Sequence, residues 1–326
     1  MTLTGPTLLG IALAAGGPSF LKQADLVGLA TATIVAATPL TLAALGGVMC
    51  ERSGVVNIAL EGIMLTTAFV GYAAAFATHS LGLGLFAAIV SGMLIALLHA
   101  VLSIEFLVDQ IVSGTVINIL ALGITGVFYR TFFQQQNVRG PGTLPVWKIP
   151  VLGDIPVVGP ILFQHQAVTY AMLVLVVVVH LVLFNTVWGL RTRACGEHPL
   201  AADTAGISVK TVRYVNVIAS GALGGLGGAY FSIQQIGNFI PNITGGRGFI
   251  ALAAMIFGKW TPAGAFLASL LFACADALGA RLQAAGVRVP YQFLGMLPYL
   301  LTIVVVAGAM GRAIAPAAVG RPYRKS

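Results

Sequence analysis

The sequence has very few charged side chains. Only 8% of its 326 residues are Asp, Glu, Lys or Arg, whereas a soluble domain carries roughly a quarter. So few charges cannot cover a water-soluble globule of this length, because its surface would be one continuous apolar patch. This excludes a soluble enzyme, a disordered protein and a small disulfide scaffold. With 58% hydrophobic residues and a mean hydropathy of +0.96, the composition indicates an integral membrane protein.

Cysteines and catalytic motifs are scarce as well. The three cysteines, Cys50, Cys195 and Cys274, form no Cys-x-x-Cys pair, which argues against a metal site or a disulfide framework. Gly258-Lys259 is followed by Trp260, so the phosphate-binding loop of nucleotide hydrolases is missing. No His-Glu-x-x-His or Gly-x-Ser-x-Gly motif occurs. We therefore expect a chain that is not an enzyme and binds no metal or cofactor itself.

Long uncharged runs are the main feature that is present. A helix needs about 20 mainly apolar residues to cross a bilayer. The expected fold class is all-α, a polytopic membrane bundle of about eight to ten helices, with short or broken helices such as 248–258. The runs that predict spans are 26–50, 62–104 (two spans around a turn at Gly82–Gly84), 110–129, 167–190, 214–246, 260–275 and 289–311.

The net charge of +8 is concentrated in two short segments beside these runs, which favours a membrane orientation signal over a nucleic-acid surface. Lys and Arg accumulate on the cytoplasmic side of membrane proteins, so the loop 189–213 and the tail 312–326 are expected inside. The basic residues are Arg191, Arg193, Lys210 and Arg213 in the loop, and Arg312, Arg321, Arg324 and Lys325 in the tail.

We expect a single membrane domain over 1–326, with its parts placed by this orientation. Its expected parts are spans over 24–129, an outer loop over 130–166, a span over 167–188, the cytoplasmic loop 189–213, spans over 214–311 and the tail 312–326. The outer loop is rich in Pro and Gly, which predicts turns and short extended pieces. Two interpretations of it remain open, a cap that meets a partner and a structured connector.

A glycine cluster lies inside an uncharged run with no strand before it. Missing side chains let helix backbones approach closely, so we interpret the cluster as a helix-packing surface rather than a dinucleotide loop. The glycines are Gly221, Gly224, Gly225 and Gly228.

The cytoplasmic loop contains a stretch with helix start and stop signals. Pro199 suits the first position of a helix and Gly206 suits a left-handed end. The spacing predicts a two-turn helix that offers Leu200, Ala201 and Ala205 to a partner; a plain loop is the alternative.

This stretch, Gly196 to Ile207, resembles the coupling segment of ABC-importer permeases, whose pattern is Gly-x-Asn-Pro-x-Ala-Ala-x-x-x-Gly-Ile. His198 stands where that family usually has Asn. Three further segments, 51–62, 246–262 and 293–300, resemble signatures of the simple-sugar and nucleoside branch, relatives of the ribose and branched-chain amino-acid permeases. Together they cover roughly residue 40 to the C-terminus.

The resemblance implies a function and a set of partners. It implies a permease in a bacterial plasma membrane that forms, with a second and different permease, a path for nucleosides or simple sugars. A separate ATPase subunit would bind ATP and Mg, and an extracytoplasmic binding lipoprotein would deliver the solute. The implied ATPase-coupling residues are Gly196, Glu197, His198, Pro199, Leu200, Ala201, Ala202, Asp203, Ala205 and Gly206.

Five residues are candidates for the translocation path. Asn57 and Glu61 are four residues apart and would share a helix face. They either line the path, or Glu61 ties its span to a neighbour through Arg52 or Arg247. Asn118 is a mid-span pore candidate, and Phe249 and Phe293 are candidates for stacking on a base.

Other acidic residues leave a second class of function open. Glu105 and Asp109 are expected to form an interfacial charge pair, and Asp276 to pair with Arg281 or to dock the binding protein. The competing hypothesis is an ion-coupled secondary transporter in which Glu61 or Asp276 relays protons.

Overall fold

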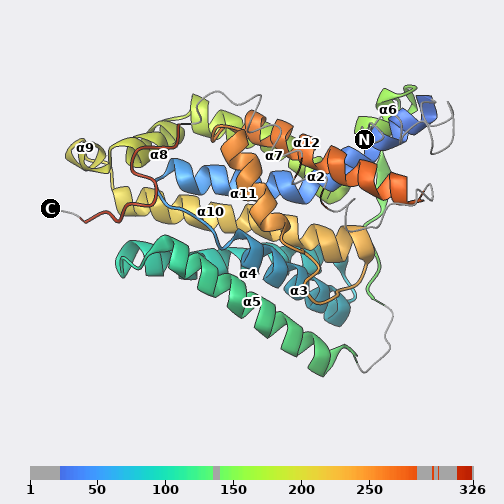
Figure 1. Ribbon diagram of the computed structural model, residues 1–326, viewed down its shortest axis with the longest axis horizontal. Coiled ribbons are helices and arrows are strands. Elements are labelled where there is room, and N and C mark those ends of the chain that lie inside the picture. The colour runs from blue at the N-terminus through green and yellow to red at the C-terminus, as the bar shows by residue number, and fades with distance from the viewer. Residues whose placement is uncertain (1–22, 135–139, 285–295, 297–299, 301–313, 325–326) are drawn as a thin grey trace, which may run out of the picture.

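The computed structural model describes residues 23–134, 140–284, 296, 300 and 314–324. Over these residues the chain forms a bundle whose long helices run along one common direction (Figure 1). The long helices are α2 (Gln23–Arg52), α3 (Leu60–Thr78), α4 (Leu81–Ala100), α5 (Gln110–Phe132), α7 (Ala167–Asn185), α10 (Val209–Ala229) and α12 (Pro262–Ala284).

Six helices of the described part are long and apolar enough to cross a membrane. They overlap the uncharged runs that predicted spans, and several extend past them into charged residues such as Glu61, Arg130 and Asp276. They are the segments Leu26–Arg52, Leu60–Thr78, Leu81–Glu105, Gln110–Phe132, Ala167–Asn185 and Pro262–Ala284. The predicted last span, 289–311, lies outside the described residues apart from two positions, and residues 1–20 lie outside them entirely.

The remaining elements are short. Two π-helical segments, η2 (Val101–Glu105) and η5 (Tyr230–Ile236), extend α4 and α10. The other short helices are α6 (Val158–Leu162), α8 (Val187–Glu197), α9 (Pro199–Thr204), α11 (Arg247–Phe257) and the 3-10 turn η4 (Leu152–Asp154). The run 214–246 is therefore not one plain span, because its helix ends at Gly237, which has a φ of 68°.

α10 lies in the core of the bundle, packed against α2, α3 and α4. Its glycines make this contact possible. A Cβ on Gly221 would lie 2.3 Å from the carbonyl oxygen of Gly92, and one on Gly228 would lie 2.2 Å from that of Met64. Gly225 and Gly224 face α4 and α3 in the same way. The backbones of these helices touch directly, as small residues allow in membrane bundles.

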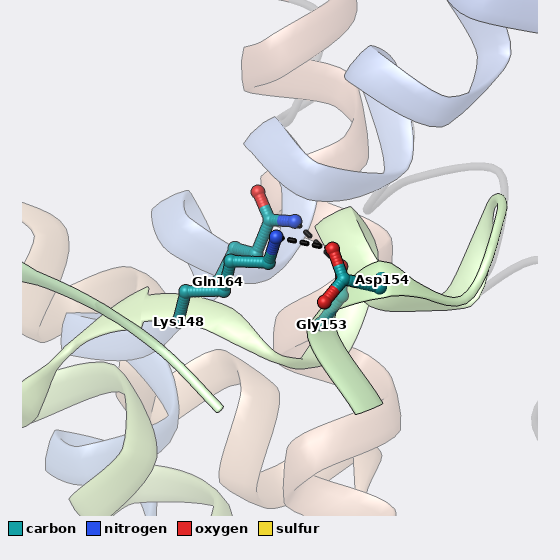
Figure 2. Close-up of polar contacts among 4 residues, drawn as sticks. All are labelled: Lys148, Gly153, Asp154 and Gln164. Carbon is teal, nitrogen blue, oxygen red and sulfur yellow. Dashed lines mark hydrogen bonds and ion pairs between the residues drawn. The ribbon is translucent and has the colours of Figure 1, made fainter. Parts of the chain in front are cut away.

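The outer loop folds into a small hairpin. Strand β1 (Val146–Lys148) pairs antiparallel with β2 (Gln164–Gln166). Figure 2 shows Lys148 paired with Asp154, and Gln164 Nε2 donating to the Gly153 carbonyl oxygen at 2.7 Å. The Leu144 N–H also donates to the Ile233 carbonyl oxygen at 3.1 Å, which fixes the loop to η5. The loop is therefore structured, and its role as a cap that meets a partner stays a prediction.

The two ends of the bundle carry different segments. α9 and the C-terminal segment lie at one end, whereas α6 of the outer loop lies at the other (Figure 1). The segment that resembles a coupling segment, Gly196 to Ile207, and the hairpin are thus separated by the length of the bundle.

Candidate functional site

The predicted cytoplasmic helix is present as α9. Pro199 occupies its first turn, and His198 Nδ1 accepts a hydrogen bond from the Ala201 N–H at 3.3 Å. A ring nitrogen therefore does the capping that a side-chain oxygen does at most helix starts. Gly206 follows the helix with a φ of 81°, which favours glycine.

One face of α9 is fixed to the bundle and the other is free. Ala202 is buried in a small apolar cluster with Cys195, Val209, Val212 and Tyr323. Leu200 is 51% exposed, and Ala201 and Ala205 are exposed as well. A partner that presses on this face would act on a helix that cannot move independently of its supports.

The C-terminal segment runs beside α9, an arrangement that the sequence did not predict. The Ala318 N–H donates to the Gly196 carbonyl oxygen at 2.8 Å, and the Ala317 N–H donates to Glu197 Oε2 at 3.1 Å. Between this segment and α9 lies a cleft of about 440 Å³. Its lining includes Leu200, Pro199, Arg321 and Arg324. This end of the bundle is therefore built from two segments far apart in the sequence.

Arg213 joins these segments to the membrane helices. Its side chain is buried, and its Nε and Nη1 donate to the carbonyl oxygens of Ser53 and Arg321, both at 3.2 Å. Its guanidinium also lies 5.9 Å from the ring centre of Tyr323. No carboxylate of the described residues pairs with it. A buried cation needs polar partners, and the two carbonyl oxygens and the Tyr323 ring are the partners of Arg213. Arg213 therefore has a structural role beyond the orientation signal that we predicted.

The connector between α2 and α3 is not helical, and this corrects one prediction. α3 begins at Leu60, so Asn57 and Glu61 do not share a helix face. Asn57 Nδ2 instead donates to Ser220 Oγ on α10 at 2.9 Å.

Side chains from other helices bind backbone N–H and carbonyl groups of this connector that have no helical hydrogen bond. Gln110 Oε1 accepts from the Val56 N–H at 2.7 Å, and His99 Nε2 lies 2.9 Å from the Val56 carbonyl oxygen. Asn118 accepts from the Gly62 N–H at 2.7 Å and donates to the Ile58 carbonyl oxygen at 2.9 Å. Non-helical backbone inside a membrane bundle requires such partners. Both ends of the Asn118 amide are therefore occupied.

Glu61 binds the start of α11. Its Oε1 accepts from Thr244 Oγ1 at 2.6 Å and the Gly246 N–H at 2.8 Å, and its Oε2 accepts from the Gly248 N–H at 2.6 Å. A carboxylate at a helix N-terminus complements its free N–H groups and its dipole. Glu61 does tie its span to a neighbour, but the expected partners Arg52 and Arg247 were wrong.

Glu51 and Arg52 bind a strained turn between α11 and α12. Lys259 and Trp260 have φ values of 54° and 52°, which L-residues rarely adopt. Arg52 Nε donates to the Trp260 carbonyl oxygen at 2.8 Å, and Trp260 Nε1 donates to Glu51 Oε2 at 2.5 Å. Two of the segments that resemble permease signatures, 51–62 and 246–262, therefore touch at both of their ends.

The other predicted residues are placed as follows. Phe249 is half exposed on α11, and Phe293 lies outside the described residues. Glu105 pairs with Lys210 at 2.7 Å. Asp109 caps α5 by accepting from the N–H groups of Ile111 and Val112. Each of these carboxylates therefore has a partner of its own.

Asp276 lies 4.0 Å from Arg247 Nη2. Within the described ranges, no group of three or more metal-binding side chains is present.

Comparisons with known proteins agree on one family. Residues 29–317 match the family model of the branched-chain amino acid transport system permease component. The chain is 45% identical over 304 residues to the guanosine ABC transporter permease protein NupQ of Bacillus subtilis, covering 90% of this chain and 95% of that protein.

Two further relatives are similar over almost their whole length. The nucleoside ABC transporter permease protein NupC of Lactococcus lactis is 41% identical, with 90% of this chain and 95% of that protein covered. A putative glucose ABC transporter permease protein of Haloferax volcanii, TsgC13, is 35% identical, with 87% and 92% covered. No solved structure matches the chain.

Proposed function

This chain belongs to the permease family of branched-chain amino acid transport systems, and on that premise we propose that it is the membrane-spanning permease subunit of an ATP-driven nucleoside importer. It is a multi-pass membrane protein, with six helices of spanning length among the described residues. The names of the two relatives above 40% identity support nucleosides as the solute. A sugar permease at 35% identity supports simple sugars as the next candidate.

The single observation that carries the proposal is the packing of α9, which has one face buried against the bundle and the other exposed. Its exposed residues, Leu200, Ala201 and Ala205, form the surface on which a separate ATPase subunit docks. Its buried face, through Ala202 and Tyr323, transmits the force of that subunit to the helices behind it. The ATPase binds ATP and Mg, and this chain binds neither.

The orientation follows from the basic residues and the two ends of the bundle. The loop 189–213 and the C-terminal segment face the cytoplasm, because Lys and Arg concentrate there. The hairpin around β1 and β2 then faces the outside, where a binding lipoprotein delivers the solute. A second, different permease completes the path. Large exposed side chains such as Ile119 and Val127 on α5 face that permease or lipid.

Ala201→Arg tests the coupling assignment. The substitution places a long cation on the exposed face of α9 without entering the core, so the chain should insert and assemble its helices normally. Uptake of radiolabelled guanosine by cells should fall to background, and co-purification of the ATPase should be lost. Ile314→Arg is the matched control, because Ile314 is 80% exposed in the C-terminal segment but lies off α9; uptake should stay at the native level.

Two results would contradict the proposal. Native uptake by the Ala201→Arg variant would refute docking on α9. Uptake that an uncoupler abolishes while cellular ATP is held constant would instead support the ion-coupled carrier.

A further inference from the structure

A cavity of about 560 Å³ lies between α2, η5, α11 and α12. Its volume falls within the ~300–1,000 Å³ that small-molecule sites occupy. It is lined by both apolar and polar side chains. The polar and aromatic residues in its lining are Thr31, Tyr230, Phe231, Gln235, Arg247, Asp276 and Arg281.

The charged residues of this cavity lie at membrane depth. α12 begins at Pro262, and a rise of 1.5 Å per residue puts Asp276 about 21 Å along its axis. The hydrocarbon core is about 30 Å thick, so a 23-residue helix centred on it would hold Asp276 inside it. Ionisable side chains at such depth face a water-filled cavity or a partner rather than lipid.

Several of these polar groups have hydrogen-bonding capacity to spare. Asp276 and Arg247 are 4.0 Å apart, and their side chains are 32% and 38% exposed, so the pair is loose and open to the cavity. Among the described residues, no hydrogen bond reaches the Tyr230 hydroxyl or the Gln235 amide. A guanidinium offers five donors and a carboxylate about four acceptor positions. The single 4.0 Å contact between them, and the position of the guanidinium 5.6 Å from the Phe231 ring centre, leave most of these donor and acceptor positions open to a polar solute.

We propose that this cavity is the site at which a nucleoside is held during transit. Asp276 accepts hydrogen bonds from the vicinal hydroxyls of the ribose, because a carboxylate is an acceptor that pairs with two neighbouring donors. Arg247 donates to the oxygen and nitrogen of a purine edge, the pairing that arginine makes with guanine elsewhere. Tyr230 and Phe231 supply aromatic surface beside them. This assignment rests on the proposed function and names the part of the chain that performs it.

The experiment measures protection of a cysteine in the cavity. Ala280 is exposed and lines the cavity, so Ala280→Cys is made in a Cys274→Ser background, in which the two remaining cysteines are buried. The complex is purified from its own membranes without the binding protein, which would impose its own selectivity. The rate of labelling by a hydrophilic thiol reagent is then measured with and without millimolar guanosine.

Guanosine should slow labelling at least threefold, whereas 2′,3′-dideoxyguanosine, which lacks the vicinal hydroxyls, should not. Asp276→Asn should remove the protection by guanosine. Val146→Cys on the outer hairpin is the control site, because Val146 is 62% exposed and does not line the cavity; its labelling rate should not change with either compound.

The outcomes separate this assignment from the proposed function. Equal labelling of Ala280→Cys with and without guanosine, in a complex that imports guanosine, overturns the cavity assignment alone. Equal protection by both nucleosides overturns the role of Asp276, even where Asp276→Asn fails to assemble. A native complex that imports no guanosine overturns the proposed solute and this site with it.

Discussion

Glu61→Gln should destabilise the protein without removing a group from the translocation path. The native carboxylate accepts three hydrogen bonds, from Thr244 Oγ1 and from the N–H groups of Gly246 and Gly248. A glutamine keeps one oxygen and turns an NH₂ group toward at least one of these donors. Hydrogen bonds to charged groups contribute about 1.5–3 kcal/mol each, so the loss of one bond predicts a decrease of about 2–3 kcal/mol in the free energy of unfolding.

The assay is the thermal midpoint of the solubilised complex, read by gel filtration after heating. A change of 1 kcal/mol shifts the Tm of large domains by roughly 2 °C, so Glu61→Gln should lower it by about 5 °C. Glu105→Gln is the matched control. Its ion pair with Lys210 is nearly half exposed on both sides, and exposed pairs contribute about 1 kcal/mol or less. Guanosine uptake below the midpoint should remain near native in both variants.

Two results would refute this reasoning. An unchanged Tm for Glu61→Gln would show that the three contacts do not stabilise the start of α11. Lost uptake at a native Tm would place Glu61 in the path after all, as the alternative interpretation had it.

Three further predictions concern other parts of the chain. Gly221→Val should abolish assembly on gel filtration, because its Cβ would lie 2.3 Å from the Gly92 carbonyl oxygen, whereas Gly126→Ala, with nothing within 4 Å, should behave as native. Arg213→Met should speed trypsin cleavage at Arg321 in inside-out vesicles, because the C-terminal segment loses its hydrogen bond to the guanidinium. Burial raises the pKa of the Cys195 thiol to about 11, so it should resist maleimide at pH 7 in the native protein and react at once in denaturant.

Local signals in the sequence predicted the elements that depend only on nearby residues. Uncharged runs predicted the long helices, because crossing a bilayer requires continuous apolar segments. Pro199 and Gly206 predicted the bounds of α9, because a fixed φ suits a helix start and glycine suits a left-handed end. The glycines of α10 indicated a packing surface in the same way.

The contacts that organise the site depend on residues far apart in the sequence. Asn57 was expected in a helix because nothing nearby forbids one there. Its connector stays extended because His99, Gln110 and Asn118, on two other helices, satisfy the backbone. Arg213 was expected only as one of the basic residues that set the membrane orientation. Its hydrogen-bond partners could not be predicted, because they lie more than 100 residues away in both directions. The spacing of residues along the chain does not predict such long-range pairings.

Arg52 has a mechanical consequence. Its carbonyl oxygen would lie 2.2 Å from a Cβ on Gly196, so the end of α8 rests directly on the end of α2. Its guanidinium meanwhile holds the carbonyl oxygens of Trp260 and Lys259, at the turn from which α12 begins.

Arg52 thus contacts both the end of α8, which leads into α9, and the turn that precedes α12, the helix that carries Asp276. A rigid displacement of α8 and α9 must either carry that turn with it or break the hydrogen bonds of Arg52. Lys259 and Trp260 already have positive φ values there, so the backbone of this turn is strained before any displacement.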